Sequence, residues 1–189
     1  GNAAGGAISV ESSASLLVTK STATNNAAIG DGDGGFLFAR LASQIFLEAV
    51  TIENSFTKSK GGGGGIALFS SKIGLFRVTL NGCQAGQRGG GGILLDEGSE
   101  AQLVDCTMNK NKATDGGSGG HIRVAASTLI LHSTGVYVWF YQVNGIFQVH
   151  TWACASTRGN IMMNGKVVDS GGGAISCMAS PSINVMTLY

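Results

Sequence analysis

The stretch IFLEAVTI (Ile45–Ile52) returns one period later as IGLFRVTL (Ile73–Leu80), with every position number raised by 28. In both copies, apolar side chains occupy the first, third, sixth and eighth positions, and most residues between them are small, polar or charged. Near alternation turns one face of a β-strand toward a core and the other toward solvent. The two copies therefore predict β-strands that recur along the chain with a fixed period.

Other apolar positions keep the same period along much of the chain, as a sequence repeat does. Five rows of residues spaced by 28 are Phe38, Ile66, Leu94 and Ile122; Ile45, Ile73 and Ala101; Leu47, Leu75, Leu103 and Leu131; Val50, Val78 and Cys106; and Ile52, Leu80, Met108 and Val136. Chance clustering of glycine would not hold apolar rows in register. We therefore interpret the pattern as a structural repeat.

Glycine pairs followed by an apolar residue mark the start of each repeat, as in GGAIS at Gly5–Ser9 and again at Gly172–Ser176. Glycine adopts backbone conformations that other residues avoid, so we expect these pairs to form a tight turn into the first strand. The expected turn glycines are Gly6, Gly35, Gly65, Gly92, Gly120 and Gly173. The spacing slips after Val136, so the repeat is irregular over residues 136–172.

The composition favours strands over helices, because charged residues make up only 12% of the chain and glycine recurs in every repeat. Short strands joined by glycine-rich turns form a stable core when successive coils stack. We predict one all-β domain over residues 1–189, a parallel β-solenoid of about seven coils with about 28 residues per coil. The end repeats resemble interior ones rather than polar caps, so we expect a segment of a longer chain or of an assembly.

Asparagines recur just after the last strand of each repeat. Asn tolerates left-handed backbone conformations, and its side chain bonds readily to nearby backbone groups. The expected corner ladder comprises Asn26, Asn54, Asn81 and Asn109. A row of ligand-binding amides is the alternative interpretation.

Repeated GGAI-type tetrads, with the turns TIEN (Thr51–Asn54), VTLN (Val78–Asn81) and CTMN (Cys106–Asn109) upstream, resemble the repeats of polymorphic outer-membrane proteins. The resemblance implies a right-handed parallel β-helix of the pectin-lyase-like kind, displayed at the cell surface or outside the cell. The tetrad is literal only at the two GGAIS copies. The phenylalanine that the family places in the turn is replaced by Ile52, Leu80 and Met108.

The acidic residues give no convergent catalytic set, although glycoside hydrolysis needs two carboxylates that flank the scissile bond. Only Asp31 and Asp33, and Asp96 and Glu97, are close in sequence. GDGDGG (Gly30–Gly35) is one copy of a calcium-type turn, so Asp31 and Asp33 are weak metal candidates, and a surface turn is the favoured interpretation. We therefore expect neither an enzyme nor a cofactor.

One predicted strand carries aromatic residues on both faces: Tyr137, Trp139 and Tyr141, with Phe140 between them. One face must point away from the core, so we expect a contact surface there. A shielding loop and a platform for stacking sugars are the alternative interpretations. Lys60 and Arg88 are separated by one full period, so they should be neighbours; they fit either solubilising loop charges or a stripe for an anionic glycan.

The formal net charge of +1 gives no general attraction to nucleic acid, and no apolar run reaches the length of a membrane-spanning helix. We expect a non-catalytic structural or adhesive module, extracellular or at the cell surface, that packs against copies of itself or against neighbouring subunits. A carbohydrate-binding or carbohydrate-active β-helix, with glycans as partners, is the alternative. The even number of cysteines (Cys83, Cys106, Cys154 and Cys177) permits disulfides and leaves their state open.

Overall fold

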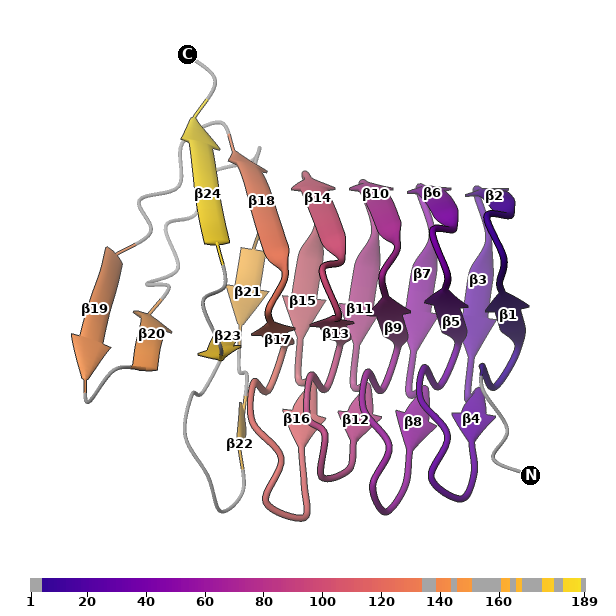
Figure 1. Cartoon of the computed structure of the whole chain (residues 1–189), viewed down its shortest axis with the longest axis horizontal. Helices are drawn as coiled ribbons and strands as arrows, with labels where there is room; N and C mark the ends of the chain where they lie inside the picture. The colour runs from indigo at the N-terminus through magenta and orange to yellow at the C-terminus, as the bar shows by residue number, and fades with distance from the viewer. Residues whose placement is uncertain are drawn as a thin grey trace.

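A computed structural model shows the chain as a stack of β coils that runs from the N-terminus toward the C-terminal half (Figure 1). It describes residues 5–133, 139–143, 146–150, 161–163, 166–167, 175–178 and 182–187, with side chains over residues 5–131. The described residues are all in strands, turns and loops, without a helix. The all-β prediction is confirmed.

Each coil adds one strand to each of four parallel sheets. Sheet A comprises β1 (Ile8–Val10), β5 (Leu37–Arg40), β9 (Ile66–Phe69), β13 (Ile93–Asp96), β17 (Ile122–Ala125) and β23 (Ile175–Met178). Sheet B comprises β2 (Ser15–Thr19), β6 (Gln44–Glu48), β10 (Lys72–Phe76), β14 (Glu100–Val104), β18 (Thr128–Ser133) and β24 (Ser182–Thr187).

The two remaining parallel sheets are built from shorter strands. Sheet C comprises β3 (Thr22–Thr24), β7 (Thr51–Glu53), β11 (Thr79–Asn81), β15 (Thr107–Asn109) and β21 (Ile161–Met163). Sheet D comprises β4 (Ala27–Ala28), β8 (Phe56–Thr57), β12 (Gln84–Ala85), β16 (Lys112–Ala113) and β22 (Lys166–Val167).

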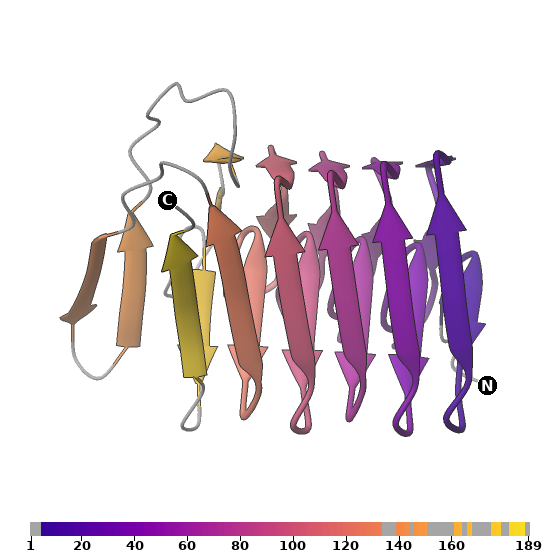
Figure 2. The same ribbon diagram turned by 90° about the horizontal axis from the view of Figure 1, so that it is seen from above.

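The coil count is lower than the expected seven. Strands β1 to β16 form four uninterrupted coils, β17, β18, β21 and β22 form a fifth, and β23 and β24 begin a sixth. Between β18 and β21 the chain holds an antiparallel hairpin of β19 (Trp139–Val143) and β20 (Ile146–His150), which lies beyond β23 and β24 at the C-terminal end of the stack (Figures 1 and 2). This hairpin uses residues that a constant spacing would assign to another coil.

The register confirms the apolar rows of sheet B. Ile45 pairs with Ile73 and Ile73 with Ala101, and the leucine row pairs in the same way from Leu47 to Leu131. These side chains are all buried and form the main core, together with the inward side chains of sheets A and C. Apolar burial of this extent is the main favourable term in folding, at about 25 cal/mol per Å² removed from water.

Two predicted rows are wrong in register. In sheet A the inward row is Ile8, Leu37, Ile66, Ile93 and Ile122, and the steps between its members are uneven because the connecting loops differ in length. The constant spacing therefore mixed this inward row with the outward Phe38 and Leu94. In sheet C, Met162 follows Met108 in the row that was expected to end at Val136, because the inserted hairpin delays the next coil. Val136 itself lies outside the described residues.

The outward side chains of sheet A form a second, smaller apolar cluster instead of facing solvent. Phe38, Ala67, Phe69 and Leu94 are buried together, and the Phe38 and Phe69 ring centroids are 5.6 Å apart. Part of the cover is the loop at Gly62, where an added Cβ would lie 2.6 Å from Leu94 Cδ2. The loops that precede the first strand of each coil therefore pack on the sheet as well as connect it.

The two glycines of each pair have different roles. The first has a positive φ in every described coil, at +74° (Gly5), +70° (Gly34), +63° (Gly63), +66° (Gly90) and +70° (Gly119), which favours glycine. The second lies against the backbone of the next coil. An added Cβ at Gly35 would lie 2.1 Å from Gly64 O, and one at Gly64 would lie 2.3 Å from Gly91 O. Both positions therefore exclude a side chain.

This geometry divides the predicted turn glycines between two rows. Backbone hydrogen bonds join Gly6 to Gly34 and Gly35 to Gly63, and the close-approach row comprises Gly6, Gly35, Gly64, Gly91 and Gly120. Gly65 and Gly92 lie one position further, in a row with Phe36 and His121. Gly173 lies outside the described residues. Runs of four and five glycines explain the ambiguity, because the sequence does not mark which member makes the turn.

The four predicted corner asparagines do not form one ladder. Asn81 pairs with Asn109, but Asn54 lies one position further along its coil, in the left-handed conformation (φ 51°). Asn26 lies one position further still, in a row with Ser55, because Phe56 N donates to Asn26 O and Gln84 N donates to Ser55 O. The buried corner amide of the fourth coil is Asn111, whose Oδ1 accepts from Cys83 N (2.8 Å) and whose Nδ2 donates to Leu80 O (3.0 Å).

A serine ladder stabilises the corner between sheets A and B. Ser43, Ser71, Ser99 and Ser127 are buried. Each of the first three donates its backbone N–H to the hydroxyl of the next, at 3.2, 3.3 and 3.1 Å. The hydroxyls of the same three serines donate to backbone oxygens within their own coil. The ladder satisfies buried polar groups that would otherwise cost about 1–3 kcal/mol each.

Candidate functional site

The predicted metal candidate Asp33 is buried and forms an ion pair with the half-exposed Arg88. The residue is 7% exposed, its Oδ1 accepts from Gly62 N (2.7 Å), and its Oδ2 accepts from Arg88 Nη1 (2.6 Å). The Arg88 guanidinium also lies over the Phe69 ring, 5.1 Å from the centroid. Burial raises the pKa of Asp33, and the Gly62 N–H and Arg88 oppose that shift. Asp33 therefore connects three coils and fixes the loop over the second apolar cluster.

Lys60 and Arg88 line the same groove, of about 440 Å³, together with Asp31, Gln87 and Arg123. Arg123 Nη1 donates to the backbone oxygen of Arg88. Burial lowers the pKa of Arg123; nearby Asp96 opposes that shift and nearby Arg88 adds to it. Three cations thus share the groove and its edge with three carboxylates, Asp31, Asp33 and Asp96. This near balance of charge does not favour a stripe for a dense polyanion.

We expect calcium to leave the melting temperature of the chain unchanged, because both carboxylate oxygens of Asp33 already have donors. Asp33→Ala should lower the free energy of unfolding by about 1–3 kcal/mol, since it removes a buried charge-assisted hydrogen bond and orphans Gly62 N. Asp31→Ala, at an exposed position of the same turn, should change it by less than about 0.5 kcal/mol. Thermal and urea unfolding with calcium and with chelator test this; a rise in melting temperature that depends on Asp33 would contradict it.

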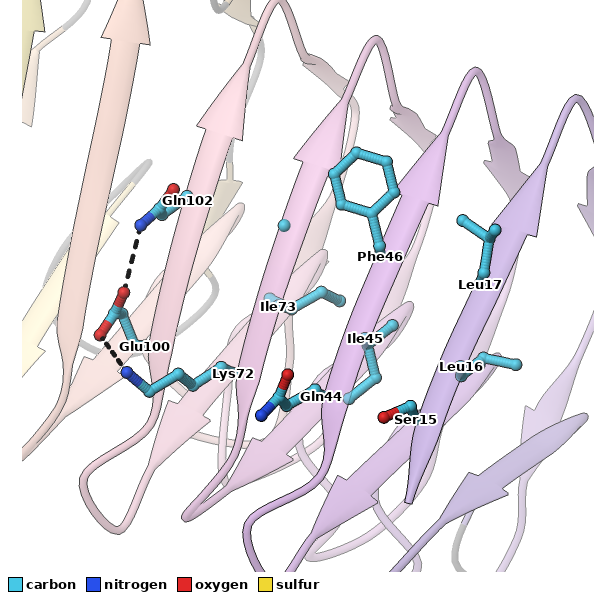
Figure 3. A pocket seen from close by; sticks show the side chains of 11 residues that line it. Ser15, Leu16, Leu17, Gln44, Ile45, Phe46, Lys72, Ile73, Glu100 and Gln102 are labelled. Carbon is cyan, nitrogen blue, oxygen red and sulfur yellow. Dashed lines mark hydrogen bonds and ion pairs between the residues drawn. The ribbon is translucent and has the colours of Figure 1, made fainter. Parts of the chain in front are cut away.

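A second groove lies on the outer face of sheet B, with a volume of about 610 Å³ (Figure 3). The register places Leu17, Phe46, Gly74 and Gln102 in one row across four strands. A second row comprises Ser15, Gln44, Lys72 and Glu100. Leu17 and Phe46 are 66% and 44% exposed, and the sequence analysis did not single out either of them. The signal was available, because both are apolar at outward positions of predicted strands.

Most glutamates of the first four coils are held in surface ion pairs. Glu11 pairs with Arg40 at 2.8 Å, Glu48 with Arg77 at 2.6 Å, and Glu100 with Lys72 at 3.1 Å. The Arg40 and Lys72 side chains lower the pKa of Glu11 and of Glu100 through hydrogen bonds. Acids with lowered pKa values remain ionised and are poor proton donors at neutral pH.

The aromatic strand predicted as a contact surface becomes part of the hairpin. Trp139 and Tyr141 lie in β19 and pair with His150 and Gln148 of β20. Tyr137 lies outside the described residues.

The first coil leaves an apolar end to the stack. Ile8, Leu16, Val18 and Ala23 pack against the core but are only partly buried, whereas their counterparts in the second coil are buried. Among the described strands, β1 and β2 are the first members of sheets A and B, and β23 and β24 are the last. Within the described strands, each of these four has a sheet partner on one side only, and the β19–β20 hairpin lies beyond β23 and β24 (Figure 1).

Comparison with known protein families assigns the fold. The family described as "Right handed beta helix region" matches residues 1–139. The chain belongs to the right-handed β-helix family. No curated protein and no solved structure matched the chain significantly. The β-helix expected from the GGAI-type repeats is therefore confirmed, with its handedness.

Two of the chemically reactive side chains in the described coils are the thiols of Cys83 and Cys106. Both are buried, and burial raises the pKa of each to about 12. His121 is fully buried, with its Nδ1 at 3.0 Å from Asn111 Nδ2. Neither cysteine forms a thiolate at neutral pH, so neither is a nucleophile there. In the part of the chain that the structure describes, no helix has the length and apolarity to cross a membrane.

Proposed function

We propose that this β-helix is a non-catalytic structural or adhesive module, extracellular or at the cell surface, that packs end to end against neighbouring chains. The observation that carries the proposal is the stacking of like coils: each coil joins the next through four parallel strands and one continuous apolar core, and a coil of a neighbouring chain can form the same kind of contact. The extracellular location rests on the resemblance to surface proteins with GGAI-type repeats.

The contact that this stacking favours is with another coil of the same kind, supplied by a neighbouring copy. The inward rows of the first coil continue those of the second, since Leu16 pairs with Ile45 and Val18 with Leu47. A further coil in the same register would bury these side chains and pair the free edges of β1 and β2. Sheets A and B end in β23 and β24, so a head-to-tail contact would join like sheets and build a filament rather than a closed dimer. The β19–β20 hairpin lies beyond β23 and β24 at that end and contacts β23, so it would have to form part of this contact or move aside (Figure 1).

The charged residues support a non-catalytic role. Glu11, Glu48 and Glu100 pair with Arg40, Arg77 and Lys72, and Asp33 is held by Arg88. Carboxylates engaged by cations at separate places on the β-helix do not form the flanking pair that glycoside hydrolysis uses. The cations therefore solubilise the surface and fix loops.

Leu16→Glu should convert end-to-end oligomers of the chain to monomers, because the new carboxylate would be desolvated between two coils. Light scattering across a concentration series measures the mass, and electron microscopy shows whether the oligomers are elongated. Leu17→Glu is the matched control, since the next residue of β2 points outward and is 66% exposed. A wild-type chain that stays monomeric at high concentration would overturn the proposal.

A further inference from the structure

The outer face of sheet B carries more exposed apolar side chains than the outer faces of sheets A and C. In sheet A the outward apolar side chains are buried in the second apolar cluster, and in sheet C the outward positions of β7, β11 and β15 hold threonine, glutamate and asparagine. On sheet B, adjacent strands carry outward apolar side chains that are exposed or partly exposed: Leu17, Phe46, Phe76, Val104 and Ile130. An apolar strip of this kind marks a contact surface.

A polar row runs beside this apolar strip (Figure 3). It comprises Ser15, Gln44, Lys72 and Glu100, and Lys72 Nζ donates to Glu100 Oε2 at 3.1 Å. Gln102 Nε2 donates to Glu100 Oε1 at 3.2 Å. The side chain of Lys72 is 69% exposed and that of Glu100 is 30% exposed, so each can accept a further partner of opposite charge.

The order of these two charges fits a second copy of the same chain. When two like sheets pack face to face around a two-fold axis that runs along the strands, the order of the strands is reversed and the level along each strand is kept. With the axis midway between β10 and β14, Lys72 of each copy faces Glu100 of the other. An axis along β10 would set Lys72 against Lys72, and an axis along β14 would set Glu100 against Glu100, so repulsion disfavours both.

The same axis also matches the neighbouring outward positions. Gly74 lies opposite Gln102 of the second copy, so the position without a side chain receives a long one. Apolar side chains meet apolar ones, with Phe46 opposite Ile130 and Phe76 opposite Val104. An isologous contact makes each of these pairs twice.

We propose that two copies of this chain pair face to face through the outer sides of their B sheets, in this register. Five strands about 4.8 Å apart, each about five residues long at about 3.3 Å per residue, give a face of roughly 400 Å². A standard interface buries about 800 Å² per partner, so this pair is weak and forms at high protein concentration. It closes at two copies and lies on the side of the stack, so it is independent of end-to-end packing.

Carbodiimide cross-linking of isotope-labelled and unlabelled chain, mixed in equal amounts, tests this register. The reagent joins a lysine amine to a carboxylate in contact with it. We expect Lys72–Glu100 cross-linked peptides with label in only one half, because such peptides join two copies. Phe46→Lys should reduce them about tenfold, since it sets a charge against Ile130 of the second copy. Ile29→Lys is the matched control, because Ile29 is 61% exposed but lies outside sheet B.

Charge reversal gives a second test, measured by sedimentation equilibrium at high protein concentration. Lys72→Glu and Glu100→Lys should each weaken pairing several-fold, because like charges then meet across the two-fold axis. The double variant should restore pairing, since it exchanges the two charges and keeps their order. Urea midpoints show that the variants remain folded, as expected for an exposed ion pair.

Leu16→Glu separates this contact from end-to-end packing. It removes the end-to-end contact and should leave the half-labelled Lys72–Glu100 peptides of the concentrated chain unchanged, so either contact can fail without the other. Absence of half-labelled peptides in the wild type, equal cross-linking in Phe46→Lys, or a double variant that pairs as weakly as the single ones would each overturn the face-to-face pair.

Discussion

Gly64→Ala should destabilise the β-helix by at least about 3 kcal/mol, at the upper end of the cost of overpacking. The added Cβ would lie 2.3 Å from Gly91 O and 2.4 Å from the carbonyl carbon of Gln84. Gly91 belongs to the next coil and Gln84 to the same coil as Gly64, and both are backbone atoms held by hydrogen bonds to neighbouring coils, so neither can move away alone. Urea unfolding followed by far-UV circular dichroism measures the change.

Gly74→Ala is the matched control for this substitution. Its Cβ would meet only the Phe46 ring, at 2.9 Å, and Phe46 is 44% exposed and free to rotate outward. We expect a change within about 0.5 kcal/mol, as at other surface positions. If the two variants proved equally stable, close approach of the coils at Gly64 would not be what selects glycine there.

The fold could be predicted from the sequence because stacking converts a sequence period into a spatial row. Leu47, Leu75 and Leu103 occupy equivalent positions in consecutive coils, and their constant spacing is visible without any structure. The serine ladder carries the same signal, since Ser43, Ser71, Ser99 and Ser127 keep that spacing too. It was missed because a lone serine before a strand resembles an ordinary turn residue.

Register was harder to predict where the loops vary in length. The step from Leu37 to Ile66 is longer than the step from Ile66 to Ile93, so a constant period exchanges inward for outward residues in sheet A. A slip by one residue reverses the face of every side chain in a strand. Only the paired strands, and the loop packed over Phe38 and Leu94, show which face of each strand points into the main core.

The candidate surfaces depend on contacts between coils that no local motif encodes. Asp33 and Arg88 are 55 residues apart, about two periods, and their pairing turns an apparent calcium turn into a structural ion pair. The groove beside Phe46 depends on Gly74, whose importance appears only when β6 and β10 are aligned. Outward residues vary freely from coil to coil, so periodicity carries little information about them.

Leu75→Ala should cost about 2–5 kcal/mol, the range for truncation of a buried leucine that leaves a cavity. Leu75 is 1% exposed and lies between Leu47 and Leu103 in the sheet B row, so the cavity weakens contacts with the coils on both sides. Leu17→Ala, at an outward position that is 66% exposed, should change stability by less than about 0.5 kcal/mol.

Two probes of the same unfolding experiment reveal how the coils are coupled. Far-UV circular dichroism reports on all strands, whereas tryptophan fluorescence reports only on Trp139 and Trp152, which follow the fifth coil's β18 in sequence. In a solenoid each coil contacts only its neighbours. A weakened third coil should therefore let the coils before it and the coils after it unfold separately. We therefore expect the two transitions to coincide in the wild type and to separate in Leu75→Ala. Coincident transitions in the variant, with a large loss of stability, would show instead that the β-helix unfolds as one unit.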